Sequence, residues 1–229
     1  MKHKLPLLLA LLALLLASCE KNPLPPEDLY FSVLGDSYST LEGYVDPETN
    51  DVWSYYDQIG VTAVEQMWWH QVAQSMDWKL DKNNSFSGSL ICNMNYAHYY
   101  GSHSFLRRMD DLGNPGVILV FGGTNDIWDE APMGDFKYDD WTEEELCTFR
   151  PALAALFSRL QRQYPEAKIW FMADGALGDE FMESVHTIAR HYHVSCIDLH
   201  DIHKDWAHPD AQGMTDIATQ AVAAIQKSV

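Results

Sequence analysis

Residues 30–39 read YFSVLGDSYS, a run of apolar residues that stops at Gly35 and is followed at once by Ser37. A compact apolar run of this length is typical of a buried strand, and the glycine predicts a tight turn at its end. Ligands of α/β sheets bind at the carboxyl ends of strands, so this turn would present the Ser37 hydroxyl at the sheet edge. A serine hydroxyl is a poor nucleophile without a base and a pocket that stabilises negative oxygen. The other segments of the chain therefore have to supply both.

The first 18 residues predict a signal peptide. They begin with Lys2 and Lys4 and continue with leucine and alanine over a run that is too short for a membrane span. The run ends LASC at residues 16–19, which resembles the lipobox of bacterial lipoproteins. That resemblance implies cleavage before Cys19 and a lipid on its thiol; an ordinary signal peptide is the alternative. We expect a protein of the bacterial cell envelope, lipid-anchored at Cys19 and facing the periplasm or the cell exterior.

The remaining chain predicts a short tether and one domain. Residues 19–28 contain three prolines and read as an extended tether, which leaves residues 29–229 for a single domain. The formal net charge of −18 repels nucleic acid and anionic lipid, so we expect neither as a partner and assign membrane contact to the lipid anchor alone. The oligomeric state stays open. Cys92, Cys147 and Cys196 lack zinc-type spacing and favour free thiols, although one disulfide remains an alternative.

Apolar patterning predicts strands that alternate with helices. The expected strands are 30–34, 78–81, 117–121, 168–173 and 194–199. The expected helices are 64–76, one ending near 109, 142–164, 180–192 and 210–227. Thr142 and Glu145 form a capping-box pattern, and residues 201–208 read as a loop. This order predicts an α/β fold, a three-layer α/β/α, flavodoxin-like arrangement of about five parallel strands with helices on both faces.

Four polar segments are expected to meet at one edge of this sheet. They are GDS at residues 35–37, NSFSG at 84–88, GGTND at 122–126 and DWAH at 205–208, and the first three follow predicted strands directly. Parallel strands point the same way, so segments after different strands converge. Together and in this order, the four segments resemble the blocks of the SGNH/GDSL hydrolase family, the GDSL-like lipases and acylhydrolases. The resemblance spans residues 31–208.

The residue types in these segments suit ester hydrolysis. Ser37 would attack the ester carbonyl, and His208 would take its proton and deliver it to the leaving alcohol, because imidazole titrates near neutral pH. Asp205 would orient the imidazole, with Asp201 and Asp198 as neighbouring alternatives. The structural alternatives are that Ser37 caps the following segment and that His208 only starts a helix.

An oxyanion hole is the second requirement, and the same blocks imply one. Its donors would be the backbone N–H groups of Ser37 and Gly88 and the side-chain amide of Asn125. Glycine at position 88 allows close approach of the backbone to the substrate. The alternatives are a turn role for Gly88 and loop hydrogen bonds for Asn125, while Asp36 is expected to brace the turn.

Aromatic residues near these segments are candidates for substrate binding. Tyr44 and Trp53 lie in the long connection after Ser37, and Trp128 follows the third block. Aromatic faces suit sugar rings, and a surface loop held by its own aromatics is the alternative. Because this segment departs from the family pattern, substrate preferences of the family do not transfer.

We therefore expect a serine esterase or acylhydrolase with a Ser-His-Asp triad that hydrolyses carboxylic esters of small molecules or glycans, including deacetylation of carbohydrate. It would need no cofactor and no metal. One alternative is a carbohydrate-binding lipoprotein on an inactive hydrolase scaffold. The other is a metal-dependent hydrolase, suggested by a histidine-rich C-terminal part, although its spacing matches no ligand signature.

Overall fold

A computed structural model describes residues 29–94 and 102–228. The predicted signal peptide, Cys19 and the tether lie outside the described residues. The central sheet has five parallel strands in the order β2-β1-β3-β4-β5. Their bounds are Leu29–Gly35 for β1, Trp78–Asn83 for β2, Val117–Phe121 for β3, Lys168–Asp174 for β4 and Ser195–Leu199 for β5. The predicted fold class and all five predicted strands are confirmed.

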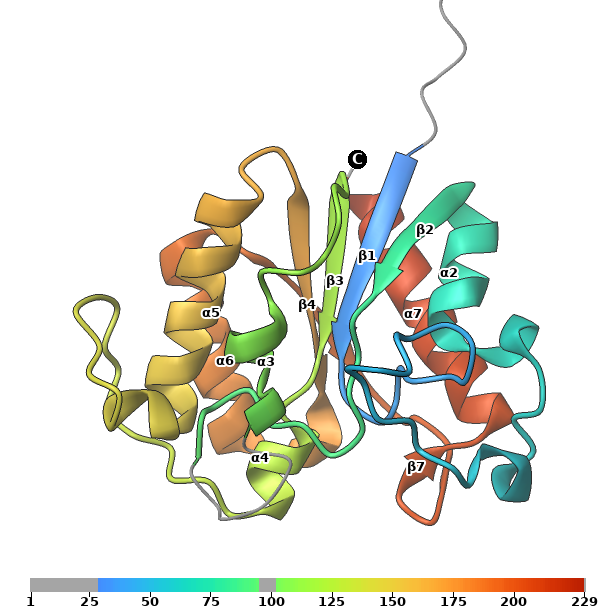
Figure 1. Cartoon of the computed structure of the whole chain (residues 1–229), viewed down its shortest axis with the longest axis horizontal. Coiled ribbons are helices and arrows are strands. Elements are labelled where there is room, and N and C mark those ends of the chain that lie inside the picture. Colours follow the sequence, from blue (N-terminus) through green and yellow to red (C-terminus); the bar gives the residue numbers. More distant parts are fainter. Residues whose placement is uncertain (1–28, 95–101, 229) are drawn as a thin grey trace, which may run out of the picture.

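Helices cover both faces of the sheet (Figure 1). On one face lie α3 (Phe105–Arg108), α5 (Phe149–Gln163) and α6 (Asp179–Tyr192), and on the other lie α2 (Trp68–Met76) and α7 (Ala211–Lys227). Each face has its own apolar core, because the inner strands are buried on both sides. Short 3₁₀ helices span Tyr56–Ile59, Val64–Gln66, Glu145–Cys147 and Gly175–Leu177.

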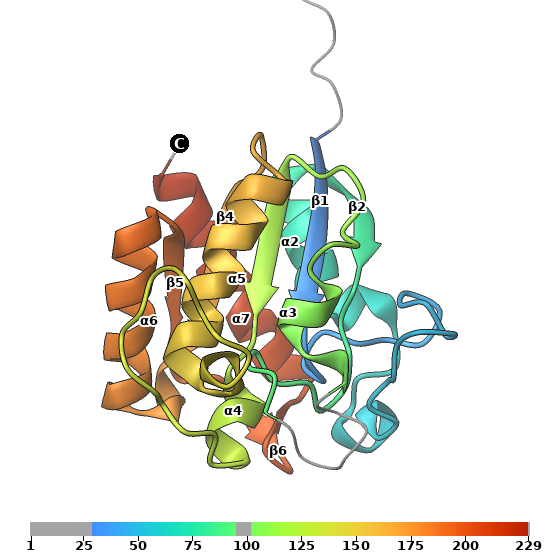
Figure 2. The ribbon, with the colours of Figure 1, turned by 60° about the vertical axis from the view of Figure 1, so that its left-hand side comes forward.

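The carboxyl ends of the strands form one edge of the molecule. Gly35 at the end of β1 pairs with Phe121 of β3, which in turn pairs with Met172 of β4. Figure 2 shows α4 (Thr124–Trp128) and β6 (Lys204–Asp205) below this edge. Leu29 and the end of α7 lie at the opposite edge (Figure 1), where Lys168 Nζ donates to Ser228 Oγ at 3.1 Å.

The structure corrects three of the predicted elements. The helix expected over 64–76 is a 3₁₀ turn followed by α2, which begins at Trp68. The Thr142–Glu145 capping box forms, but it opens a 3₁₀ helix, and α5 begins only at Phe149. Pro151 thereby falls in the first turn of α5, where a helix needs no N–H donor. The loop expected over 201–208 contains an antiparallel hairpin of β6 and β7 (His208–Pro209).

Two further observations concern the cysteines and the length of the helices. Cys92, Cys147 and Cys196 are free thiols. Within residues 29–94 and 102–228, no helix is long and apolar enough to cross a membrane.

Candidate active site

Ser37 and His208 meet at the carboxyl edge of the sheet. Ser37 lies in the turn after β1, which is closed by a hydrogen bond from Ser39 N to the Asp36 carbonyl at 3.0 Å. Its Oγ lies 3.0 Å from Nε2 of His208, although the two residues are 171 positions apart in sequence. Ser37 is 4% and His208 is 9% exposed. This is the hydrogen-bonded pair that an activated serine nucleophile requires.

His208 is presented by the two-residue turn of the β6–β7 hairpin. Asp205 pairs with His208 across the hairpin, and the turn residues Trp206 and Ala207 have φ of 48° and 64°. Two positive φ values at the centre of a two-residue loop define a type I′ turn, which normally takes Asn or Gly. The Tyr38 hydroxyl donates to the Ala207 carbonyl at 2.7 Å and fixes this turn to the residue after the serine. The strained backbone is therefore held in place by the segment that carries Ser37.

The partner of the second ring nitrogen of His208 differs from the expected one. Nδ1 lies 3.2 Å from the Trp206 carbonyl, so Nδ1–H donates there and Nε2 is left to accept from the serine. Asp205 is exposed, and among the described residues no hydrogen bond joins it to the ring. Of the two alternatives, Asp198 pairs with His186 at 2.8 Å and Asp201 is an exposed residue at φ 51°. The turn brings a backbone carbonyl to the position where we expected a carboxylate.

The surroundings of His208 favour its neutral form. Burial lowers the pKa of the imidazole below its ordinary value, the Trp206 carbonyl opposes that shift, and the nearby Lys204 ammonium adds to it. Lys204 forms an ion pair with the buried Asp174 at the end of β4 and lies over the Tyr38 ring. A neutral imidazole at neutral pH is the form that accepts a proton.

The three predicted oxyanion donors lie on segments that meet beside Ser37. Gly88 has φ 75°, which favours glycine. Asn125, in the first turn of α4, donates from Nδ2 to the Ser89 carbonyl at 2.9 Å and is 8% exposed. The backbone N–H groups of Ser37 and Gly88 donate to no turn, loop or side-chain acceptor in the described part of the chain. An amide nitrogen has two hydrogens, so Asn125 keeps one donor besides the bond to Ser89.

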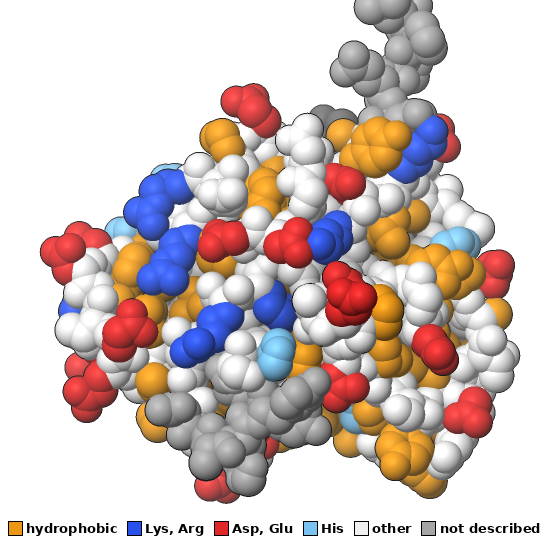
Figure 3. Space-filling model, viewed as in Figure 1, with side chains coloured by type: hydrophobic (Ala, Val, Ile, Leu, Met, Phe, Trp, Pro, Cys, Tyr) orange, Lys and Arg blue, Asp and Glu red, His pale blue; other side chains and the backbone are white. Residues whose placement is uncertain are grey.

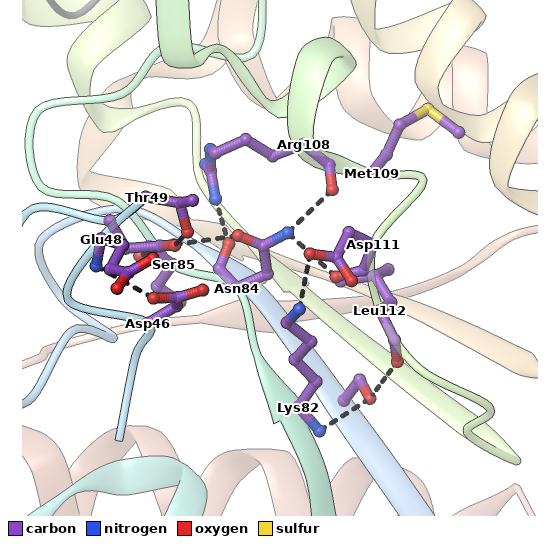
Figure 4. Close-up of polar contacts among 12 residues, drawn as sticks. Asp46, Glu48, Thr49, Lys82, Asn84, Ser85, Arg108, Met109, Asp111 and Leu112 are labelled. Carbon is purple, nitrogen blue, oxygen red and sulfur yellow. Dashed lines mark hydrogen bonds and ion pairs between the residues drawn. The ribbon is translucent and has the colours of Figure 1, made fainter. Parts of the chain in front are cut away.

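The segment that carries Gly88 is held by Arg108, a residue that the sequence analysis missed. Its guanidinium donates to the Asn84 carbonyl, to the Gly35 carbonyl at 3.1 Å and to Ser89 Oγ at 2.9 Å. Asn84 returns a hydrogen bond to the Arg108 carbonyl at 2.9 Å, and Figure 4 shows these two residues facing each other. Burial lowers the pKa of Arg108 to about 9, so it stays charged at neutral pH. Nothing in the local sequence distinguishes this arginine from Arg107 beside it.

Two buried carboxyl groups lie under the site. Asp36 accepts from Tyr38 N at 3.0 Å, which supports the predicted bracing role, while its Oδ2 is buried with no partner among the described residues. Asp126 accepts from Ile91 N at 2.8 Å and from Cys92 N at 3.1 Å. Burial raises the pKa of Asp36 to about 7 and that of Asp126 to about 6.

Aromatic side chains surround the Ser37–His208 pair. Trp53 stacks on the imidazole with ring centroids 3.8 Å apart and planes 8° apart, and Trp128 meets it edge-on at 6.0 Å. Tyr44 packs instead on Trp69 at 5.3 Å, so only two of the three predicted substrate-binding aromatics contact the imidazole. Trp206 is 66% exposed on the hairpin and was missed by the sequence analysis.

The surface beside the pair is partly apolar and hollowed. A hollow of about 560 Å³ is lined by Trp53 and Tyr56 and by the carboxylates of Glu42, Asp51 and Asp57. Figure 3 shows hydrophobic side chains at the lower right of that face, where residues 41–66 and the hairpin lie. In residues 29–94 and 102–228, no group of three or more His, Cys, Asp or Glu side chains is placed to hold a metal ion.

Both the sequence and the fold of this chain match known proteins. A family model described as GDSL-like lipase/acylhydrolase matches residues 29–225. A crystal structure from Bacteroides ovatus, of a protein assigned as a GDSL-like lipase, is 46% identical, with a TM-score of 0.83 over 87% of this chain and 99% of that one. A second, from Bacteroides uniformis with the same assignment, is 41% identical, with a TM-score of 0.83 over 87% and 96%.

More distant structures share the fold alone. An acetyl xylan esterase from Butyrivibrio proteoclasticus is 16% identical, with a TM-score of 0.60 over 90% of this chain and 65% of that one. Among curated proteins, none matches this chain.

Proposed function

The chain belongs to the GDSL-like lipase/acylhydrolase family and is a serine ester hydrolase, and from this premise we propose that Ser37 and His208 carry out the reaction as a pair oriented by the Trp206 carbonyl. The observation that carries the proposal is the 3.0 Å contact between Ser37 Oγ and His208 Nε2. The Trp206 carbonyl takes the orienting role that a carboxylate has in a triad.

Each residue has a defined part in this mechanism. Nε2 of His208 takes the hydroxyl proton as Ser37 Oγ attacks the ester carbonyl carbon. The carbonyl oxygen becomes negative and is stabilised by the N–H groups of Ser37 and Gly88 and the free N–H of Asn125. The tetrahedral intermediate collapses, and Nε2 returns the proton to the departing alcohol. A water molecule then repeats the two steps on the acyl-enzyme and releases the acid.

We assign carbohydrate esters as the substrate class. The support is three exposed aromatic side chains on the segments around the pair: Trp206 (66% exposed), Tyr55 (51%) and Trp128 (45%). Flat aromatic faces bind sugar rings through apolar contact, and the carboxylates of the neighbouring hollow accept hydrogen bonds from hydroxyl groups. Among proteins that share the fold, one is an acetyl xylan esterase.

A fluorophosphonate probe tests the chemistry. We expect covalent labelling at Ser37 that survives a chelator, and no labelling in Ser37→Ala, whose fold is checked by circular dichroism. Unlabelled wild-type protein that still binds glycans would instead support a binding protein on an inactive scaffold.

The substrate class is tested with acetylated glycans against aryl acetates. Trp206→Ala is expected to raise KM for the glycan ester several-fold and to leave KM for the aryl acetate unchanged, because only the larger substrate reaches this face. An equal effect on both substrates would contradict the assignment of carbohydrate esters.

We also propose that the protein is anchored in the cell envelope through Cys19. The support is the LASC sequence at residues 16–19. Wild-type protein expressed in bacteria should partition into detergent and carry diacylglycerol on Cys19 by mass spectrometry. Cys19→Ser should remain in the aqueous phase, and aqueous wild-type protein would refute the anchor.

A further inference from the structure

The imidazole of His208 has an aromatic partner on its face as well as hydrogen bonds at both nitrogens. Trp53 lies parallel to the ring with centroids 3.8 Å apart and planes 8° apart. It comes from the connection between β1 and α2, not from the hairpin that carries His208. Its indole is held by the Tyr56 ring at 4.9 Å and the Tyr55 ring at 5.9 Å, both edge-on, while its backbone N–H donates to Thr40 Oγ1 at 3.2 Å. The stack is thus built into the fold.

Among the residues that the structure describes, the groups around His208 give its protonated form no anionic contact. Ser37 Oγ and the Trp206 carbonyl are neutral, and the rings of Tyr38 and Trp128 meet the imidazole edge-on at 5.3 Å and 6.0 Å. The charged group that faces the ring is the Lys204 ammonium, which disfavours a second positive charge even though it is paired with Asp174. Proton transfer from Ser37 nevertheless requires an imidazolium in a site that is 9% exposed.

The face of an indole ring is suited to stabilising this imidazolium. Its π-electrons carry negative potential, and a cation over the face of tryptophan is attracted more strongly than over any other aromatic ring. The attraction exists only when His208 is protonated, so it stabilises the transition state more than the resting enzyme. Because the imidazole itself is buried, water screens this attraction less than it would at an exposed histidine.

We propose that Trp53 is a positioning residue for catalysis, whose indole face stabilises the His208 imidazolium in place of the missing carboxylate. The inference rests on the proposed function of the Ser37–His208 pair. It gives the connection between β1 and α2 a part in the chemical step besides any part in substrate binding.

The test changes the charge distribution of the Trp53 ring without changing its shape. Site-specific incorporation of mono- to tetrafluorotryptophan at position 53 weakens the negative face stepwise, whereas burial and stacking are retained. The His208 pKa is read by NMR on protein with ¹³C-labelled histidine, and His208→Gln identifies the resonance. We expect the pKa to fall steadily with fluorine number, by about 0.5–1.5 units over the series. The same series at Trp141, whose Nε1 donates to the Lys137 carbonyl, is the control and should leave the pKa unchanged.

Kinetics on the same proteins give the second readout. The acid limb of the pH profile of kcat/KM should move to lower pH as the His208 pKa falls. On the plateau above that limb, kcat/KM should fall by up to about tenfold, because the imidazolium is less stabilised. If the His208 pKa stays constant across the fluorotryptophan series at position 53, the inference is overturned even if the protein hydrolyses esters. A pKa that falls with fluorine number in a protein without esterase activity upholds the stack and refutes the proposed function instead.

Discussion

Asn125 and Asp205 lie on either side of the Ser37–His208 pair in the proposed reaction: one would hold the oxyanion, and the other neighbours the histidine on the hairpin. Asn125 is predicted to be an oxyanion donor, and from α4 its Nδ2 donates to the carbonyl of Ser89, the residue after Gly88. Asp205 was predicted to orient His208, but the Trp206 carbonyl makes that contact. A sequence pattern can point to Asn125 as a candidate because the predicted role belongs to a side chain. It cannot identify a backbone carbonyl, which every residue carries.

Asn125→Ala should lower kcat by about two to three orders of magnitude, because one oxyanion donor contributes about 3–4 kcal/mol to the transition state. Loss of the bond to Ser89 should cost only about 1 kcal/mol of folding stability. Steady-state kinetics and urea unfolding separate the two effects. An unchanged kcat would show that Asn125 is not an oxyanion donor.

Asp205→Asn should keep kcat within about threefold of wild type, because in residues 29–94 and 102–228 no hydrogen bond joins this side chain to the imidazole. Asp198→Asn, which removes a surface partner of His186, is a matched control of the same chemistry. Steady-state kinetics on an aryl acetate measure both variants. A carboxylate that orients a catalytic histidine contributes about 10⁴-fold to kcat. A loss of that size in Asp205→Asn but not in Asp198→Asn would show that Asp205 completes a Ser-His-Asp triad.

Sequence reasoning missed α4 and the β6–β7 hairpin, and the composition of the hairpin explains why it was missed. The inner strand β3 is recognisable because it is a continuous apolar run, VILVF, whereas the edge strand β2 reads WKLDKN. The hairpin strands have two residues each, and the turn between them is Trp206-Ala207 in place of the glycine or asparagine that signals a type I′ turn. Its conformation depends on Tyr38, which is far away in sequence.

Ala207→Gly should stabilise the protein. Ala207 has φ 64°, and a left-handed conformation costs a residue with a Cβ about 1 kcal/mol, which glycine avoids. The greater freedom of glycine in the unfolded chain offsets part of this gain, so we expect up to about 0.5–1 kcal/mol. Urea unfolding measures the difference. Ala207→Val should destabilise at the same position, and a reversed order of the two variants would contradict a strained turn.

For the whole molecule, the carboxyl groups buried under the site set part of the pH dependence of stability. The folded-state pKa of Asp36 is raised to about 7 from 3.8, so between these values the folded protein binds more protons than the unfolded chain. Stability therefore falls as the pH rises through this window. Asp126, raised to about 6, acts in the same direction.

Asp36→Asn should raise the Tm at pH 8 and change it little at pH 4, because asparagine keeps an acceptor for Tyr38 N and carries no charge to bury. Calorimetry at the two pH values gives the comparison. Asp111→Asn is a surface control, since Asp111 pairs with Lys82 and is 69% exposed. An Asp36 variant less stable than wild type at pH 8 would mean that the buried carboxylate is favourable in its charged form.

The direction of the strands has a practical consequence for how the enzyme can be displayed. Both described ends of the domain, at Leu29 and beyond Lys227, lie at the edge of the sheet away from Ser37 (Figure 1). A bead, fusion partner or cell surface joined at either end would leave the reacting side turned outward. The enzyme should therefore keep its esterase activity when it is immobilised through either of these two ends.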